Sequence, residues 1–389
     1  MNILFLIGVY PNIGGTEKIA TILANQFASQ GGRVCIASFE QPMLELSSEL
    51  DRGVALRKLE SPILSRSNVE ILRGIIAEFK IDIIMNQWCL PFYTTMLCNR
   101  AIKGTNCKLL SVLHGVPNNS LKVILAQKGV EGAKNLFTRA INRTKLFLTH
   151  QIIKRSIKYT YKNSDRYILL SKGYVPIFQE YTNVKDLSKL VVIGNPVTIS
   201  TDYSTNYLAH KKRQILYVGR MDIDNKRVDR IIDIWADIYD DYEDWELVLV
   251  GGGSHLETLE RSVAQRAIKR VTFTGFVKED PIQYYKDASI LMLTSDLEGF
   301  GLVIVEGMSY GVVPVVYGST PSFFDIIDHE KSGFITDAPY SHAQNVSMLR
   351  SLIDDPKILS TMSIEAQNRS KSFLLGRVID QWNQLLKSL

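Results

Sequence analysis

Two acidic residues and two glycines stand close together in the segment DLEGFGLVIVEGMSYG, which begins at residue 296. Glu298 lies near its start and Glu306 follows eight positions later, inside an apolar run. A carboxylate can accept hydrogen bonds from two sugar hydroxyls at once. Gly299 and Gly301 allow tight turns and lead into a predicted helix whose free N–H groups suit a phosphate. The spacing therefore predicts a corner that holds a nucleotide-sugar, whose parts follow the order hexose, pyrophosphate, ribose.

These glutamates also have a purely structural explanation. In that interpretation Glu298 is a charge on a surface loop, and Glu306 is a partly buried carboxylate paired with a neighbouring side chain. The spacing alone does not separate the two explanations, so the other motifs have to decide between them.

Two cations follow another predicted strand in the stretch YVGRMDIDNKRVDRII. Arg220 and Lys226 come directly after the apolar run 215–218, in a loop at the strand's carboxyl end. Two fixed cations there can neutralise a departing pyrophosphate without a metal ion. Arg227 and Arg230 are expected to be solvated charges on the next helix.

Glycines mark two further loops. Gly14 and Gly15 end the first predicted strand, and we expect Thr16 to cap the helix that follows. The spacing in GVYPNIGG differs from G-x-G-x-x-G, which argues against a dinucleotide-binding dehydrogenase. In VGGGS, residues 250–254, the glycines admit a nucleotide or serve only a turn, and both interpretations remain open.

His114, in SVLHGVP, is the one histidine that we expect in a carboxyl-end loop of the N-terminal half. A lone histidine is more often structural than catalytic. The other five histidines have no partner pattern, and the four cysteines have neither C-x-x-C spacing nor a histidine at metal-ligand spacing. We therefore expect buried free thiols and no metal site.

Apolar runs alternate with helix-like segments along most of the chain. Runs that are apolar on both faces and separated by helices predict parallel sheets covered on both sides. The polar stretch 198–213 lacks periodicity and predicts a linker, so we expect two doubly wound domains joined near residue 200, with ligands beyond the carboxyl ends of the strands and a cleft between the sheets. The predicted strands are 3–7, 34–39, 81–85, 109–113, 167–170, 190–193, 215–218, 247–250, 271–274, 290–293 and 313–316.

Composition sets the broad class of the protein. A length of 389 residues fits two domains, and 46% hydrophobic with 22% charged residues is typical of a soluble globular enzyme. The net charge of +5 does not indicate a general polyanion binder. The first apolar run lacks a basic n-region, which predicts a first strand rather than a signal peptide, and no run is long enough to span a membrane. We expect a cytoplasmic protein that is not integral to a membrane.

Taken together, the motifs resemble family 4 of the retaining glycosyltransferases, enzymes of the GT-B architecture. The most specific element is E-x7-E, from Glu298 to Glu306. Four further elements occur in the family's order: GGTE at 14–17, GNPV at 194–197, VGRMD…K from 218 to 226 and FTGFV at 273–277.

The resemblance implies an α/β protein with two Rossmann-like, doubly wound parallel-sheet domains that face a central cleft. Residues 1–197 would form the acceptor domain and residues 198–373 the nucleotide-sugar donor domain. The last helix, within 374–389, would pack back on the first domain.

The resemblance also assigns roles by position in the motifs. Arg220 and Lys226 would hold the donor pyrophosphate, Glu298 the donor-sugar hydroxyls and Glu306 the ribose, while His114 would lie beside the reactive carbon of the sugar. The implied catalytic residues are Glu298, His114, Arg220 and Lys226. The implied donor-binding residues are Gly14, Gly15, Gly219, Arg220, Lys226, Gly252, Phe276, Val277, Glu298, Gly299, Phe300, Gly301, Leu302, Val303 and Glu306.

The resemblance implies a hexosyltransferase that takes a UDP- or GDP-linked sugar as co-substrate, with no other cofactor and no metal. Transfer with retention follows front-face attack or a covalent intermediate; we favour the first, because no carboxylate is placed as a nucleophile. Two departures leave the donor class open. Arg227 stands where members usually have glycine, and Asp325 where glutamate is common.

The segment 120–162 carries ten Lys or Arg residues against the single acid Glu131, and its cations alternate with apolar residues. This composition is typical of basic amphipathic helices at anionic membrane surfaces. An ordinary solvated helix face is the alternative, and no nucleic-acid motif accompanies the charge. We therefore expect peripheral attachment at the inner face of the cytoplasmic membrane, where a glycan or lipid-linked acceptor would be presented.

Three other functions are compatible with parts of the pattern. A nucleotide-sugar epimerase of the same architecture would act without an acceptor. A phosphorylase would need a pyridoxal-bearing lysine, for which no motif is visible. A non-catalytic nucleotide-sugar-binding partner subunit would not need the four charged residues of the motifs.

Overall fold

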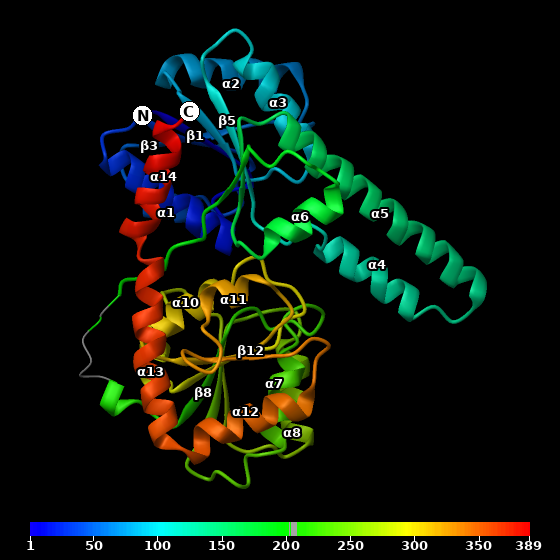
Figure 1. Ribbon diagram of the computed structural model, residues 1–389, viewed down its shortest axis with the longest axis vertical. Helices are drawn as coiled ribbons and strands as arrows, with labels where there is room; N and C mark the ends of the chain where they lie inside the picture. Colours follow the sequence, from blue (N-terminus) through cyan, green and yellow to red (C-terminus); the bar gives the residue numbers. More distant parts are fainter. Residues whose placement is uncertain (202, 204–207) are drawn as a thin grey trace. The chain divides into compact units, whose positions relative to one another are not determined.

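The computed structural model describes residues 1–201, 203 and 208–389 (Figure 1). Its contacts divide the chain into two compact units. The first unit comprises Met1–Asn195 together with Val378–Leu389, and the second comprises Pro196–Arg377. The predicted linker 198–213 lies in part outside the described residues, and its end forms a short 3₁₀ turn, η2, at Leu208–His210.

The first unit contains a seven-stranded sheet in the order β3-β2-β1-β4-β5-β6-β7, in which every strand pair is parallel. The strands are β1 Ile3–Val9, β2 Val34–Glu40, β3 Val54–Lys58, β4 Ile83–Asn86, β5 Lys108–Leu113, β6 Arg166–Leu169 and β7 Leu190–Val192. β1, β4 and most of β2 are buried, as expected for strands covered on both faces.

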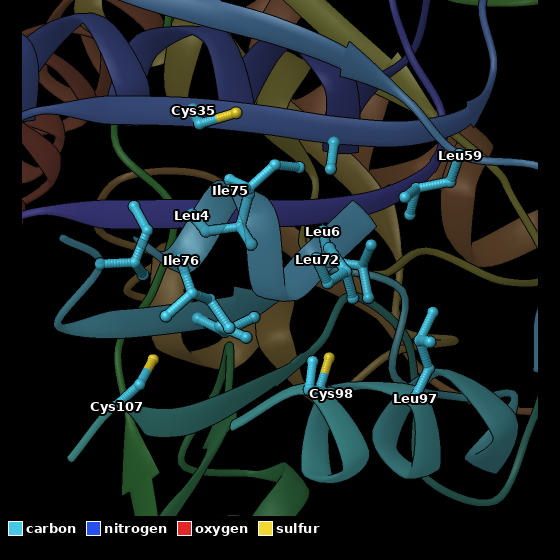
Figure 2. Close-up of a cluster of buried hydrophobic side chains, with 14 of the residues drawn as sticks. Leu4, Leu6, Cys35, Leu59, Leu72, Ile75, Ile76, Leu97, Cys98 and Cys107 are labelled. Atoms are coloured by element: carbon cyan, nitrogen blue, oxygen red, sulfur yellow. The ribbon is translucent and has the colours of Figure 1, made fainter. Parts of the chain in front are cut away.

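Helices cover both faces of this sheet. They are α1 Gly15–Ser29, α2 Arg66–Phe79, α3 Phe92–Ile102, α4 Leu121–Glu131, α5 Leu136–Lys162, α6 Tyr174–Thr182 and the returning α14 Leu375–Lys387, with a 3₁₀ turn η1 at Leu44–Glu49. The core on one face is built from β-strand residues such as Leu4 and Leu6 against Leu72 and Ile76 of α2 (Figure 2). All four cysteines are buried free thiols, as predicted.

The second unit contains a six-stranded parallel sheet in the order β10-β9-β8-β11-β12-β13. Its strands are β8 Gln214–Val218, β9 Glu246–Val250, β10 Val271–Gly275, β11 Ile290–Leu293, β12 Val313–Tyr317 and β13 Phe334–Thr336. Its helices are α7 Val228–Ala236, α8 Leu256–Gln265, α9 Ile282–Asp287, α10 Leu302–Ser309, α11 Ser322–Ile326, α12 His342–Asp354 and α13 Pro356–Ser370, followed by the 3₁₀ turn η3 at Lys371–Phe373.

The predicted strands are confirmed to within about two residues at each end. Two strands lay outside the prediction. β3, VALRK, is only half-buried at a sheet edge, so its apolar signal is weak. β13 has three residues, which is too short for a periodic pattern.

Candidate functional site

Both sheets have a point at which the strand order reverses. In the second unit the chain runs from β8 outward to β10 and returns beside β8 as β11. Ligands of doubly wound sheets bind beyond the carboxyl ends of the strands at such a switch point. The two loops that flank it are residues 219–227 after β8 and 294–301 after β11. In the first unit, the loops after β1 and β4 flank the equivalent point.

Lys226 and Glu298 meet at the switch point of the second unit. Lys226 Nζ lies 2.5 Å from Glu298 Oε1, and the two side chains are only 19% and 13% exposed. Asn225 ties the same loops together, because its Nδ2 donates to Leu297 O at 3.2 Å and its carbonyl accepts from Asp296 N at 2.8 Å. The loop backbones therefore fix the position of the ion pair.

Arg220 lies in the same neighbourhood, next to the hydroxyl of Tyr217. That hydroxyl donates to the Arg220 carbonyl at 2.7 Å. Burial raises the pKa of Tyr217 well above its ordinary value, the charges of Glu298 and Asp222 raise it further, and the charge of Arg220 lowers it. Lys226 and Glu298 are therefore in contact at this point, and the charges of Glu298 and Arg220 both act on the Tyr217 hydroxyl.

The predictions for Arg227 and Arg230 were wrong, because neither side chain is a freely solvated helix charge. The Arg230 side chain is 13% exposed, donates to Thr294 O and Asp296 Oδ1, and lies 4.1 Å from the ring centre of Tyr340. Arg227 precedes α7 with φ 52°, in the left-handed region that favours glycine. This backbone conformation explains why glycine suits the position in the family that the sequence resembles.

The helix α10 begins at the end of the β11 loop. Gly301, its N-cap residue, has φ 101°, and a Cβ there would come within 2.9 Å of Ile304 and 3.0 Å of Phe323. The Phe300 side chain is buried, and its carbonyl accepts from Ser322 Oγ at 3.0 Å. The side chains of Leu302 and Val303 are half-buried, so this turn offers a ligand mainly its backbone N–H groups.

Glu306 is 5% exposed, on the buried side of α10. Thr198 Oγ1 donates to one carboxylate oxygen and Tyr285 OH donates to the other, at 2.9 Å for the tyrosine. Both oxygens therefore have protein donors. A carboxylate oxygen has capacity for a second donor, so a ribose that binds Glu306 shares these oxygens with Thr198 and Tyr285.

The glycines of VGGGS allow the loops after β8 and β9 to pack against each other. A Cβ on Gly251, whose φ is 134°, would lie 1.9 Å from Gly219 O. A Cβ on Gly253 would lie 2.5 Å from Met221 O. Backbone bonds fix this contact, since Met221 N donates to Gly252 O at 2.9 Å. The structure thus gives Gly251 and Gly253 a structural reason to be glycine.

Gly252 faces the loop after β10. A Cβ at Gly252 would lie 3.2 Å from Cβ of Phe276, whose side chain is 60% exposed. Val277 is half-buried beside it. An exposed aromatic ring at the carboxyl edge of a sheet suits the face of a nucleotide base.

Gly14 and Gly15 lie at the end of the loop after β1, in the first unit, and both are exposed. Gly14 is the N-cap residue of α1 and no side chain caps it, so the expected Thr16 cap is wrong. The side chain of Glu17 fills the space beside Gly14, because its Oε2 lies 2.2 Å from where a Gly14 Cβ would stand. Burial raises the pKa of Glu17.

His114 follows β5 in the first unit and is half-buried. Its Nε2 forms a short hydrogen bond with Oε1 of Gln87. Burial lowers the pKa of His114 to about 4. The sequence analysis did not select Gln87, although the polar pair Asn86-Gln87 directly after an apolar run is a signal that could have found it.

Tyr217, Thr198 and Tyr285 also escaped the sequence analysis. Each hydroxyl forms a hydrogen bond with a predicted site residue: Tyr217 with Arg220, and Thr198 and Tyr285 with Glu306. Tyr217 lies in β8, Thr198 in the predicted linker and Tyr285 in α9. No spacing rule links them to the residues that they contact.

One group of side chains in the described part of the chain has the geometry of a metal site. Ligand atoms of Asp222, Asp224 and His255 all lie within 4.8 Å of one another. Asp222 Oδ1 already accepts the backbone N–H groups of Asp224 at 2.7 Å and Asn225 at 3.2 Å. This carboxylate therefore stabilises the turn after β8, and exposed acidic groups of this kind are common without an ion.

The basic segment forms a hairpin of two helices, α4 and α5, which projects from the sheet of the first unit (Figure 1). Asn142 Nδ2 donates to Gly129 O at 2.6 Å and joins the two helices. Eight of the sixteen exposed large hydrophobic residues among the described ones lie in this hairpin: Leu121, Leu125, Leu136, Phe137, Ile141, Phe147, Leu148 and Ile152. No helix in the described part of the chain is both long and apolar enough to cross a membrane.

Comparisons with known proteins agree with this architecture. Residues 13–201 match the family Glycosyltransferase Family 4, and residues 201–369 match the family Glycosyl transferases group 1. An uncharacterized glycosyltransferase of Haemophilus influenzae is 24% identical over 96% of both chains. An alpha-1,4-N-acetyl-D-galactosaminyltransferase of Campylobacter jejuni, which acts on a PP-undecaprenol-linked saccharide by its name, is 21% identical over 99% of this chain and 98% of its own.

The crystal structure of Anabaena Alr3699/HepE in complex with UDP and glucose covers 100% of both chains at 18% identity, with a TM-score of 0.75. This likeness establishes the two-sheet architecture as the GT-B fold. The family matches and the relatives identify the protein as a glycosyltransferase. It belongs to the group 1 glycosyltransferases with a family 4 N-terminal region, as the motifs predicted.

Proposed function

We propose that this glycosyltransferase is a retaining hexosyltransferase, which moves a sugar from a UDP- or GDP-linked donor to a glycan or lipid-linked saccharide. The observation that carries the proposal is the Lys226–Glu298 ion pair beside Arg220 at the switch point of the second sheet. The name of the Campylobacter jejuni relative supports a lipid-linked acceptor, and a role in cell-surface polysaccharide or lipopolysaccharide synthesis.

In the proposed reaction, Glu298 orients the hydroxyls of the donor sugar, and Arg220 and Lys226 stabilise the charge on the leaving pyrophosphate. The sugar passes through an oxocarbenium-like state. The acceptor hydroxyl attacks from the face that the nucleotide leaves, and a phosphate oxygen takes its proton. The new bond therefore keeps the configuration of the old one, and side-chain cations take the part that a metal ion plays in other transferases.

We assign the remaining donor contacts by the position of each residue in the family motifs. The backbone from Gly299 to Val303 meets the phosphates and the sugar, while Phe276 and Val277 lie near the base. Glu306 binds the ribose. By the same motif positions we assign His114 to the reactive carbon of the sugar, and the loop of Gly14 and Gly15 to the phosphates and the acceptor.

A panel of nucleotide-sugars tests the proposal by thermal shift, since a ligand that binds the native state raises its melting temperature. We expect UDP- or GDP-linked hexoses to raise it and free sugars to leave it unchanged. Product analysis by NMR then has to show an acceptor-linked sugar with the anomeric configuration of the donor. Isomerised donor without any acceptor would identify an epimerase instead, and inverted product would exclude retention.

We further propose that the α4–α5 hairpin attaches the enzyme to the anionic inner face of the cytoplasmic membrane. Phe137, Ile141, Leu148 and Ile152 repeat at helical spacing along one stripe of α5, which is about 40 Å long. The ten cations of the hairpin complement anionic lipid head groups, each contributing about 1 kcal/mol near such a surface. A lipid-linked acceptor would be within reach of an enzyme held in this way.

Vesicle flotation tests the attachment. The enzyme should float with vesicles that contain phosphatidylglycerol at low salt, and less with phosphatidylcholine vesicles or at high salt, because salt screens the charges. The double variant Phe137→Ser, Leu148→Ser should lose binding. Phe324→Ser, which removes a ring that is 60% exposed outside the hairpin, is the matched control. No flotation at low salt, or equal loss in the control, would refute the attachment.

A further inference from the structure

The inference concerns Gln87, in the loop after β4 at the switch point of the first sheet. The backbone of this loop is fixed from several directions. Gln87 N donates to Leu6 O of β1 at 2.8 Å, and Trp88 N donates to Asn86 Oδ1 at 3.2 Å. Asn86 is in turn held by Thr94, with 3.0 Å between Nδ2 and Oγ1.

Trp88 adds a steric constraint to these hydrogen bonds. Its ring fills the space beside Gly8, where a Cβ would lie 2.7 Å from the ring. Its ring centre is 5.8 Å from that of Phe39. Because the loop has little freedom, the Gln87 side chain leaves the backbone from a defined position, and it is only 4% exposed.

The side-chain amide of Gln87 contacts His114, which follows the neighbouring strand β5. His114 is neutral near pH 7, since burial lowers its pKa to about 4. A neutral imidazole carries one N–H and one lone pair. With Gln87 Oε1 as the acceptor, the proton lies on Nε2 and Nδ1 keeps the lone pair. The contact therefore selects one tautomer of the ring.

We infer that Gln87 is a positioning residue that fixes His114 as the Nε2–H tautomer, so that Nδ1 accepts a hydrogen bond from a hydroxyl of the transferred sugar. The inference rests on the proposed function in that it takes His114 to act on the sugar. The Gln87 amide nitrogen supports it, because this buried donor has no hydrogen-bond partner among the described residues. Leaving a buried donor unpaired is unfavourable, and a hydrogen bond to a ligand oxygen removes that penalty.

An imidazole lone pair with a neutral amide donor suits an uncharged hydroxyl. A carboxylate would bring its own lone pairs toward Nδ1, with no second proton on the ring to receive them. The pair of an accepting Nδ1 and a donating amide therefore suits a hydroxyl, which can donate to the first and accept from the second.

The test uses ¹⁵N NMR of the histidine rings in the full-length enzyme without ligand, with His114 assigned by its loss in His114→Gln. The wild-type ring should show a protonated Nε2 and an unprotonated Nδ1 at pH 7. Gln87→Met keeps the side-chain length but removes the amide, and should give a mixture of tautomers. Gln87→Glu places a carboxylate beside the ring and should raise the pKa of His114. Gln265→Met, at an exposed position on α8, is the control.

Steady-state kinetics supply the second readout. In Gln87→Met, kcat should fall roughly tenfold or more while the KM for the donor changes little, because a positioning role acts on the transition state. Unaltered ring shifts in Gln87→Met, a wild-type ring protonated on Nδ1, or altered shifts with normal kcat would each overturn the inference. A wild-type enzyme that turns over no nucleotide-sugar would refute the proposed function instead, while the ring shifts still test the tautomer.

Discussion

Lys226 Nζ and Glu298 Oε1 lie 2.5 Å apart, and this contact joins the two loops at the switch point of the second sheet. The cation assigned to the leaving group and the carboxylate assigned to the sugar are therefore neighbours before any donor binds. A donor that places its sugar and its pyrophosphate at this point meets both groups at once.

Replacing Lys226 should remove transfer while the protein stays folded. If Lys226 acts as one preorganised donor to the leaving pyrophosphate, Lys226→Ala loses about 3 kcal/mol of transition-state stabilisation, or roughly 100-fold in kcat/KM. Activity assays alongside circular dichroism check this. Lys269→Ala, at an exposed lysine of the same unit, should behave as wild type. Wild-type turnover by Lys226→Ala would remove its assignment.

The hydroxyl of Tyr285 should stabilise the second unit through Glu306. Tyr285→Phe takes one donor from a buried carboxylate that is 5% exposed, which should lower the free energy of unfolding by about 1–3 kcal/mol. Urea denaturation measures the loss. Tyr284→Phe changes the neighbouring residue, whose side chain is half-buried, and should have little effect. Equal losses in the two variants would mean that the hydroxyl of Tyr285 does not support Glu306.

Gly251 should tolerate no side chain. In Gly251→Ala the new Cβ would stand 1.9 Å from Gly219 O at a φ of 134°, so we expect more than about 1 kcal/mol of destabilisation and weaker donor binding. Gly74→Ala is the matched control, because open space surrounds this position inside α2 and alanine favours a helix by about 0.5–1 kcal/mol. Thermal melts of both variants, with and without donor, separate the effects. An unchanged melt for Gly251→Ala would show that the loops move apart at no cost.

His114 should make stability depend on pH. Its pKa is about 4 in the folded chain and about 6.5 when unfolded. As the pH falls from about 6.5 to about 4, the unfolded chain binds a proton that the folded chain does not, so the free energy of unfolding decreases. The full decrease is at most about 3 kcal/mol, and it stops near pH 4.

Urea denaturation at pH 7, 5.5 and 4.5 measures this contribution as the difference between wild type and His114→Gln. The variant should lose less stability than wild type as the pH falls. The exposed His210→Gln is the control and should follow wild type. If the free energy of unfolding depends on pH in the same way for wild type and His114→Gln, then the pKa of His114 is the same in the folded and the unfolded chain, and the prediction is wrong.

The alternation of apolar runs was enough to predict both sheets and the loops that carry Arg220, Lys226 and Glu298. Parallel strands buried on both faces leave a strong local signal, and the carboxyl-end position of a loop follows from strand order along the chain. Gly219 and Gly251 show the limit of prediction from local sequence signals. Gly251 has to be glycine because a Cβ there would lie 1.9 Å from Gly219 O, and that contact joins two loops that are distant in sequence. A Cβ on Gly219 would lie 2.7 Å from the hydroxyl oxygen of Tyr217.

The partners of the charged groups were beyond the sequence for the same reason. Glu306 is 108 residues from Thr198 and Gln87 is 27 residues from His114, and only the fold brings them into contact. Arg230 looked like a solvated helix charge because its spacing on α7 says nothing about Asp296 or the ring of Tyr340. Tertiary packing, rather than any local sequence pattern, determines the contact partners of these side chains.

The assignment of Val378–Leu389 to the first unit has a consequence for how the protein is made. On the ribosome, the strands of the first unit emerge before the whole second unit, yet the helix that completes them follows it. Until then, the apolar surface that α14 covers remains exposed to solvent and prone to aggregation. The residues of α14 that are buried are Val378, Ile379, Trp382, Leu385 and Leu386. A gene that encodes the first unit alone would therefore need codons 378–389 joined directly after codon 195 to yield a folded product.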